Sequence, residues 1–105
     1  MKLKNIIANN GATIGKKDEI SFTSGYQVSK KDLSVIPTYK LRKKDLLAIL
    51  ETLKTREYLG VWIDNNKAYI DISEHRLSLD QALSLGKKRN QISIFDWSTK
   101  DCIYC

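Results

Sequence analysis

The stretch from Leu59 to Ile72 constrains the fold of this 105-residue chain more than any other. Two short runs of alternating apolar residues flank Asp64-Asn65-Asn66-Lys67, and asparagine tolerates the positive φ angles of tight turns. A two-residue turn at Asn65-Asn66 sets Trp62 opposite Tyr69 and gathers the apolar residues on one face. That face is predicted to lie on the core and consists of Leu59, Val61, Ile63, Ala68, Ile70 and Ile72. The other face combines aromatic rings with charges: Trp62, Asp64, Lys67, Tyr69 and Asp71.

Two segments have the apolar spacing of amphipathic helices. Residues 42–55 carry an apolar stripe of Leu46, Leu47, Ile49, Leu50 and Leu53, with charged residues on the opposite side. The second helix is predicted to begin after Ser78, because Gln81 three residues later completes a capping box. Its buried stripe is predicted to be Leu79, Ala82, Leu83 and Gly86.

Most of the remaining chain is predicted to form strands. Residues 12–15 are expected to pair with a strand over residues 19–28 across Lys16-Lys17-Asp18, and residues 19–28 alternate at period two. Pro37 ends a short apolar run, so a strand there is expected at a sheet edge. Two strands are expected after the second helix, the last of them over residues 102–105.

These elements indicate one α+β domain over residues 1–105, with a small mixed or antiparallel sheet and two helices in the order β-β-(β)-α-β-β-α-β-β. Residues 1–58 make a basic β-rich region with a helix, and residues 59–105 make a ββαββ module. A sheet covered on both sides, by one helix on each face, competes with a sheet whose Trp62 face is open. Burial is expected for Trp97 rather than for Trp62.

The charge is unevenly distributed along the chain. The net charge is +6, and residues 1–56 hold twelve of the eighteen lysine and arginine residues but only five of the twelve acidic ones. A basic half of this kind suits phosphate or an acidic protein surface, although solvated lysines on a small soluble protein give the same pattern. No apolar run reaches the roughly 20 residues of a membrane-spanning helix. We therefore expect a cytoplasmic protein with no membrane partner.

No catalytic signature stands out in the sequence. His75 is the only histidine, and the sequence places neither cysteine in a setting that stabilises a thiolate. The chain has no GxxxxGK or GxGxxG phosphate loop. Asp64 and Asp71 form a carboxylate pair on one hairpin face, which a solvated surface explains equally well. We therefore expect a protein that is not an enzyme.

The Cys102-x-x-Cys105 motif at the end of the chain predicts a zinc site. Its spacing is that of a zinc knuckle, and His75 with Asp71, Glu74 or Asp101 could complete four ligands. Residues i and i+3 of a regular strand point to opposite faces, so both thiolates reach one ion only if the chain bends. Two reduced cysteines, one of them buried, are the alternative.

Two surfaces are candidates for binding a macromolecule. The aromatic and charged face of Trp62 and Tyr69 has the composition of a protein-binding hot spot. The basic run of Lys40, Arg42, Lys43 and Lys44 could meet an acidic surface, because cations at a helix start are unfavourable without an anionic partner. Direct nucleic-acid binding through the basic half, with Tyr26 or Tyr39 stacking on bases, is the second possibility.

Several patterns resemble a module of small phage-encoded proteins. They are Gly60-x-Trp62-x-Asp64, Tyr69-x-Asp71, Ala82-x-x-x-Gly86 and Gln91-x-Ser93-Ile94-x-Asp96. The segments NNGATI and SGYQVSKKDL also resemble small proteins from prophages of Gram-positive bacteria. Some compact proteins of that setting are anti-CRISPR inhibitors of type II-A effectors, and this chain is similar in size and style.

The resemblance implies a non-enzymatic protein in the host cytoplasm that binds a defence effector, with Cas9 as the leading partner. Many such inhibitors are acidic mimics of DNA, whereas this chain has a net charge of +6. Docking onto an acidic or mixed protein surface therefore fits better than competition for a DNA groove. The alternative function is a basic nucleic-acid-binding accessory protein of phage replication or regulation.

Overall fold

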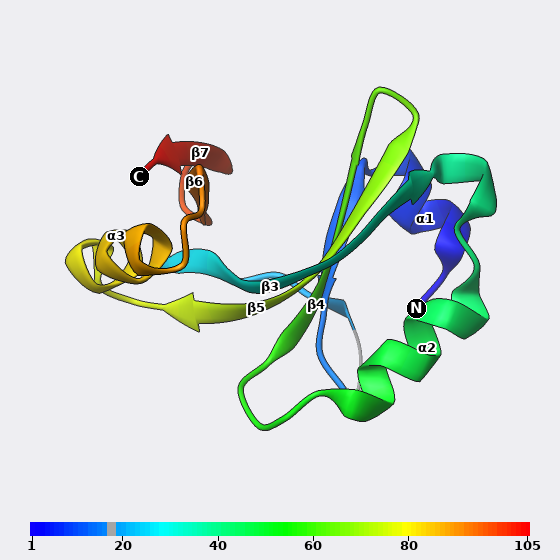
Figure 1. Cartoon of the computed structure of the whole chain (residues 1–105), viewed down its shortest axis with the longest axis horizontal. Helices are drawn as coiled ribbons and strands as arrows, with labels where there is room; N and C mark the ends of the chain where they lie inside the picture. Colours follow the sequence, from blue (N-terminus) through cyan, green and yellow to red (C-terminus); the bar gives the residue numbers. More distant parts are fainter. Residues whose placement is uncertain (17–18) are drawn as a thin grey trace.

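The computed structural model describes residues 1–16 and 19–105 and has the α+β architecture that the sequence predicts (Figure 1). Its strands are β1 (Gly11–Ile14), β2 (Glu19–Ile20), β3 (Tyr26–Pro37), β4 (Tyr58–Asp64), β5 (Lys67–Arg76), β6 (Ser93–Asp96) and β7 (Asp101–Tyr104). Its helices are α1 (Leu3–Ala8), α2 (Lys43–Thr52) and α3 (Leu79–Lys88), with a 3-10 turn η1 (Thr38–Lys40) before α2. Within the described ranges, no helix is both long and apolar enough to cross a membrane.

The described strands form one antiparallel sheet in the order β2-β1-β4-β5-β3-β6-β7. The predicted hairpin is confirmed, since Val61 pairs with Ile70 and Trp62 pairs with Tyr69. Both turn asparagines have positive φ angles, 48° and 61°, as a two-residue hairpin turn requires. β3 comes from the N-terminal half and lies between β5 and β6, so the strands of residues 59–105 are not all neighbours in the sheet.

All three helices pack on the same face of this sheet. The apolar hairpin face packs against α1 and α2 in a cluster that includes Ile6, Leu46 and Leu50. The other end of that face packs against α3 in a smaller cluster, whose buried members are Val28, Ala82 and Ile94. The alternative of one helix on each face of the sheet is therefore wrong. Ile70, which packs near α2, and Glu74, which contacts α3, are four residues apart in β5, so their side chains lie on the same side of the strand. The opposite face, with Trp62 and Tyr69, has no helix over it in the described chain.

The two predicted helices form with shorter bounds and narrower buried stripes than the sequence predicts. Leu46 and Leu50 are buried in α2, but Leu47 is 45% exposed. Ser78 caps α3 as expected, because its hydroxyl accepts a hydrogen bond from the Gln81 amide at 3.3 Å. Ala82 and Gly86 face the sheet, whereas Leu79 is 39% exposed at the start of the helix.

Two parts of the N-terminal prediction are wrong. Residues 3–8 form the short helix α1, whose buried residue is Ile6, in a region predicted to be β-rich and without a helix. The predicted strand over residues 19–28 is broken between β2 and β3, because Gly25 adopts a φ of 87°. The pairing of β1 with β2 is confirmed, through Thr13 with Ile20 and Ile14 with Glu19. Part of the predicted connecting turn, residues 17–18, lies outside the described residues.

Candidate functional site

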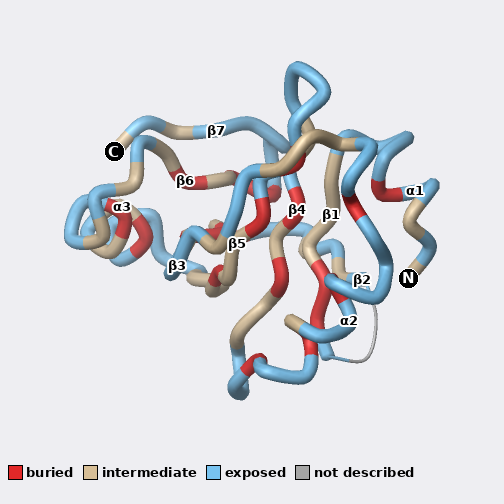
Figure 2. Tube along the Cα trace, turned by 45° about the vertical axis from the view of Figure 1, so that its right-hand side comes forward, coloured by how far each residue is buried: buried red, intermediate tan, exposed pale blue. Residues whose placement is uncertain are grey.

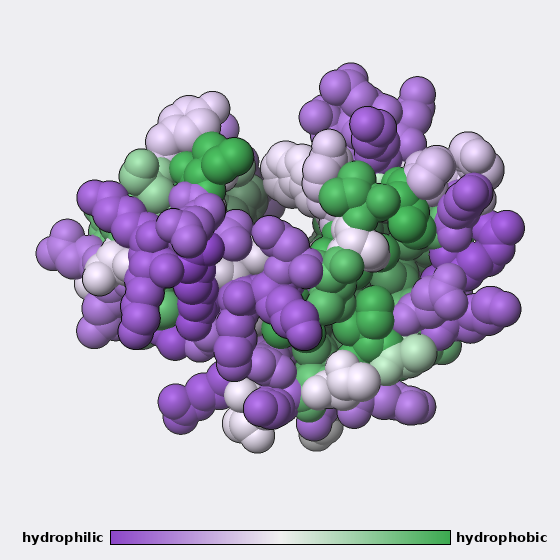
Figure 3. Space-filling view, in the orientation of Figure 1, coloured by the Kyte–Doolittle hydropathy of each residue, from purple (hydrophilic) through white to green (hydrophobic). Residues whose placement is uncertain are grey.

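The open face of the sheet is hollowed into a cleft of about 730 Å³. Residues of β3 and β5 form its floor, β4 and β5 of the hairpin form one wall together with β1, β2 and residues 9–10, and β6 with β7 forms the other wall. Figure 1 shows the arrangement of these strands. The space-filling view shows the hollow between these two walls (Figure 3). The sheet positions the side chains of the cleft, because every second residue of each strand points to this face.

The hairpin wall carries the two exposed aromatic side chains that the sequence singles out. Trp62 is 52% exposed and Tyr69 is 41% exposed, whereas Val61 before Trp62 and Ile70 after Tyr69 are buried. Figure 2 shows buried positions within β4 and β5. The two rings project from directly paired positions, so they lie side by side on one face. The hairpin thus presents a contiguous aromatic surface at the edge of the cleft.

The floor of the cleft holds the Asp71 carboxylate, and the exposed Asp32 of the neighbouring strand lies beside it. Asp71 in β5 pairs directly with Asp32 in β3. The Ser29 hydroxyl donates a hydrogen bond to an Asp32 carboxylate oxygen at 3.2 Å, and it is also close enough to Asp71 to lower the pKa of that carboxyl by hydrogen bonding. Burial raises the pKa of Asp71, and the charge of Asp32 raises it further, against the effect of the Ser29 hydrogen bond.

Gly60 fixes where the Asp71 carboxylate lies. Gly60 pairs with Asp71 across β4 and β5, and a Cβ atom added at Gly60 would overlap the Asp71 carboxylate. The absence of a side chain therefore lets Asp71 lie over the backbone of β4, on the same face as Trp62. The carboxylate is held beside the aromatic surface.

A buried polar network lies between the floor and the second wall. The Trp97 indole N–H donates to the Gln27 side-chain oxygen at 3.0 Å, and the Gln27 amide nitrogen donates to the Ser73 hydroxyl at 2.9 Å. Trp97 is 8% exposed, so its expected burial is confirmed. Because each of these polar groups has a partner, the network holds this part of the cleft rigidly.

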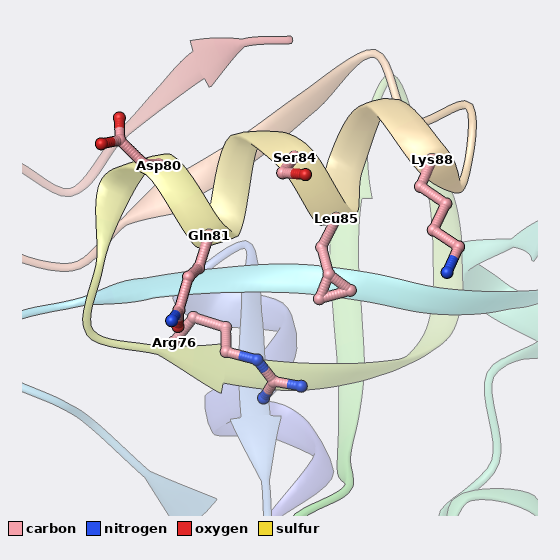
Figure 4. Close-up of a pocket in the computed structure, with 6 residues that line it drawn as sticks. All are labelled: Arg76, Asp80, Gln81, Ser84, Leu85 and Lys88. Carbon is pink, nitrogen blue, oxygen red and sulfur yellow. The ribbon is translucent and has the colours of Figure 1, made fainter.

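The helix-covered face carries an ion-pair cluster instead of a cleft. The Glu74 carboxylate forms ion pairs with two guanidinium groups: Arg89 at the C-terminus of α3, with an N–O distance of 2.6 Å, and Arg76, with an N–O distance of 2.5 Å. Burial raises the pKa of Glu74, but the hydrogen bonds from Arg89 and Arg76 outweigh it and leave that pKa lowered. A shallow depression beside this cluster runs along α3 and is lined by Arg76, Asp80, Gln81, Ser84, Leu85 and Lys88 (Figure 4).

The candidate zinc ligands are not gathered at one point. Cys102 pairs with Phe95 and lines the cleft, whereas Cys105 lies against Gly86 and Ile94 on the helix side. The His75 ring stacks on Phe22 at 3.7 Å between centroids, and its Nε2 lies 2.8 Å from the Ser24 carbonyl oxygen. In the described chain no three His, Cys, Asp or Glu side chains are grouped to hold a metal ion.

A zinc site at Cys102, Cys105 and His75 remains a prediction that elemental analysis tests. About one equivalent of zinc that Cys102→Ser removes would support the site. Less than about a tenth of an equivalent in the wild-type protein would exclude it.

The basic run of Lys40, Arg42, Lys43 and Lys44 lies on the helix side of the sheet. It spans η1 and the first turn of α2, and all four residues are exposed. The neighbouring Leu41 and Leu46 pack into the cluster under the hairpin. The structure therefore brings Trp62 and Tyr69 together but separates them from the basic run.

Sequence reasoning missed Gln27, Ser29 and Asp32 as part of the site. It noted Asp71 as a partner of Asp64 on the hairpin face, as a candidate zinc ligand and in the Tyr69-x-Asp71 pattern, but not as part of this site. The predicted hairpin register already sets Gly60 opposite Asp71, and a glycine inside a strand often marks the close approach of another group. That signal could have identified Asp71.

No known protein-family model, curated protein or solved structure matches this chain.

Proposed function

We propose that this chain is a phage-encoded, non-enzymatic inhibitor that binds a host defence effector, type II-A CRISPR Cas9, by protein–protein docking. The observation that carries the proposal is the open sheet face, on which Trp62 and Tyr69 stand side by side at the edge of a cleft. The choice of Cas9 as partner comes from the resemblance of the sequence patterns to small prophage proteins.

The aromatic surface has the properties of a binding hot spot. Tryptophan and tyrosine are enriched among the residues that contribute most of the binding energy. Their contribution is large when the partner excludes water around them. Trp62 and Tyr69 are held by a paired hairpin, so little conformational freedom is lost on binding. A partner segment that enters the cleft would cover both rings at once.

The positive charge suits the approach to the partner more than the contact itself. Lys40, Arg42, Lys43 and Lys44 lie away from the aromatic surface, and charges outside an interface raise the association rate through long-range attraction. With a net charge of +6, the chain would approach an acidic or mixed protein surface. This charge does not suit imitation of DNA.

A pull-down with guide-loaded Cas9, followed by a DNA-cleavage assay, tests the proposal. We expect a stable complex and inhibited cleavage, and Tyr69→Ala should weaken the complex at least about tenfold. Tyr39→Ala is the matched control, because Tyr39 is 76% exposed in η1 and is not among the residues that line the cleft, so its loss should change affinity less than about twofold. Intact cleavage without a stable complex would refute the proposal.

A second candidate function is nucleic-acid binding as an accessory protein of phage replication or regulation. The observation that favours it is the exposed Tyr39 beside the basic run, with the Lys40 amino group 6.0 Å from the centre of the Tyr39 ring. Bases stack on exposed aromatic rings while neighbouring cations contact phosphates. A salt titration of DNA binding tests this function, since phosphate contacts give a steep dependence on salt that Tyr39→Ala alone would not change.

A further inference from the structure

We infer that Asp71 on the cleft floor, together with the exposed Asp32 that pairs with it, recognises an arginine side chain of the protein partner, which Trp62 and Tyr69 cover. The inference deepens the proposed function, because the arginine belongs to a bound protein. Four features of the described residues support it.

Within the described residues, neither carboxylate takes part in an ion pair. Ion pairs of the described residues join Lys30 to Glu57, and Arg76 and Arg89 to Glu74. None of them reaches Asp71 or Asp32. A desolvated carboxylate without a counter-ion is costly, so a cation supplied from outside would gain a strong charge-assisted contact.

The carboxylates are also short of hydrogen-bond donors. Ser29 has one hydroxyl proton, yet its oxygen lies within hydrogen-bonding reach of both Asp71 and Asp32. One carboxylate therefore lacks the Ser29 proton whenever the other receives it. A guanidinium group brings five N–H donors in a planar fork and can serve both carboxylates together.

The aromatic rings lie where they can cover a planar cation. Asp71 is two residues from Tyr69 in β5, and its partner Gly60 is two residues from Trp62 in β4, so these groups share one face. Indole and phenol rings attract cations over their faces, and arginine stacks on such rings more readily than lysine. The combination of carboxylates and rings selects arginine over lysine.

Gly60 keeps the site in place. A side chain at this position would overlap the Asp71 carboxylate and push it off the backbone of β4. Gly60→Ala therefore displaces the carboxylate without removing its charge. This variant therefore tests whether the position of the Asp71 carboxylate matters when its negative charge is kept.

A peptide titration tests the inference without the nuclease. The probes are acetyl-Gly-Arg-Gly-amide, the same tripeptide with lysine, and the same tripeptide with uncharged citrulline. Binding is followed by NMR shifts of the Trp62 indole N–H and the Gly60 and Asp71 amides. We expect saturable millimolar binding of the arginine peptide, several-fold weaker binding of the lysine peptide, and no saturation with citrulline.

The variants give the decisive comparison. Asp71→Asn should weaken binding of the arginine peptide about tenfold or more, because it removes the charge and keeps the shape. Asp64→Asn makes the same charge change on the same hairpin face, at its exposed tip, and should alter affinity less than about twofold. Gly60→Ala should weaken binding about as much as Asp71→Asn.

Two outcomes would overturn the inference: equal binding of the arginine and citrulline peptides, or equal effects of Asp71→Asn and Asp64→Asn. Neither outcome depends on Cas9. If the arginine peptide binds as expected and Cas9 does not, the site stands and the proposed partner is wrong. If Cas9 binds and Asp71→Asn leaves peptide binding unchanged, the proposed function stands and the arginine site is wrong.

Discussion

Replacement of Ile94 by alanine should destabilise one end of the molecule selectively. Ile94 is 2% exposed and belongs to the small cluster under α3, whose only other fully buried members in the described chain are Val28 and Ala82. The substitution removes three carbon atoms, worth about 2.4 kcal/mol at ~0.8 kcal/mol per buried methylene. The cavity that remains raises the expected cost to about 3 kcal/mol.

The damage should be local, because the larger cluster under the hairpin does not contain Ile94. We expect a lower urea midpoint and, by hydrogen exchange with mass spectrometry, faster exchange in β6, β7 and α3 than in β1, β4 and β5. The second wall of the cleft would then open while the hairpin wall stays folded.

Ile92→Ala is the matched control for this experiment. Ile92 lies two residues away, just before β6, and is 79% exposed, so the same loss of carbon atoms should change stability by less than about 0.5 kcal/mol. Equal effects of the two substitutions would refute the assignment of Ile94 to a packed cluster. Uniform loss of protection across both clusters would refute the local nature of the damage.

Three further substitutions test the polar contacts. Glu74→Gln should cost about 2 kcal/mol near neutral pH in urea unfolding, since two charge-assisted hydrogen bonds are lost. Because the pKa of Glu74 is lowered, its contribution is present above its ordinary value of 4.5 and is lost as the pH falls, so the difference between variant and wild type should shrink in acid. Asp71→Asn should raise the urea midpoint near pH 7. The pKa of Asp71 is raised, so the wild type loses stability as the pH rises from 3.8 through the folded-state pKa, and the gain should vanish below 3.8. Gln27→Leu should lower the free energy of unfolding by about 2 kcal/mol, because it leaves the Trp97 indole N–H and the Ser73 hydroxyl without their hydrogen-bond partner. The near-ultraviolet circular dichroism spectrum should also change. An unchanged urea midpoint would argue against the network.

The predictions that the structure confirms came from patterns of residues close together in the sequence. The hairpin register follows from the Asn65-Asn66 turn and from the alternation beside it, because a two-residue loop leaves one way to pair the strands. The cap of α3 follows from Ser78 and Gln81, which are three residues apart. These interactions lie within a few residues of one another, so the sequence displays them directly.

The cleft floor could not be predicted because long-range pairing makes it. Asp32 reaches Asp71 only because β3 lies beside β5, and the register of that pair shifts between Ser29 and Lys31 and again between Asp32 and Ser34. Such irregularities change which side chains share a face, and nothing local marks them. The break at Gly25 was missed for a similar reason, since the Phe22 ring leaves the predicted strand to stack on His75, far along the chain.

The charge distribution combines two requirements that a single partner surface can meet. The chain has eighteen lysine and arginine residues, yet no ion pair of the described residues places one of them on Asp71 or Asp32. A net charge of +6 attracts an acidic surface from a distance, whereas the cleft floor rejects acidic side chains at contact. A partner that satisfies both conditions is acidic overall and presents one arginine at the docking point. Attraction then sets the rate of encounter, and the uncompensated Asp71 sets the specificity, because wrong partners leave that carboxylate buried and unpaired.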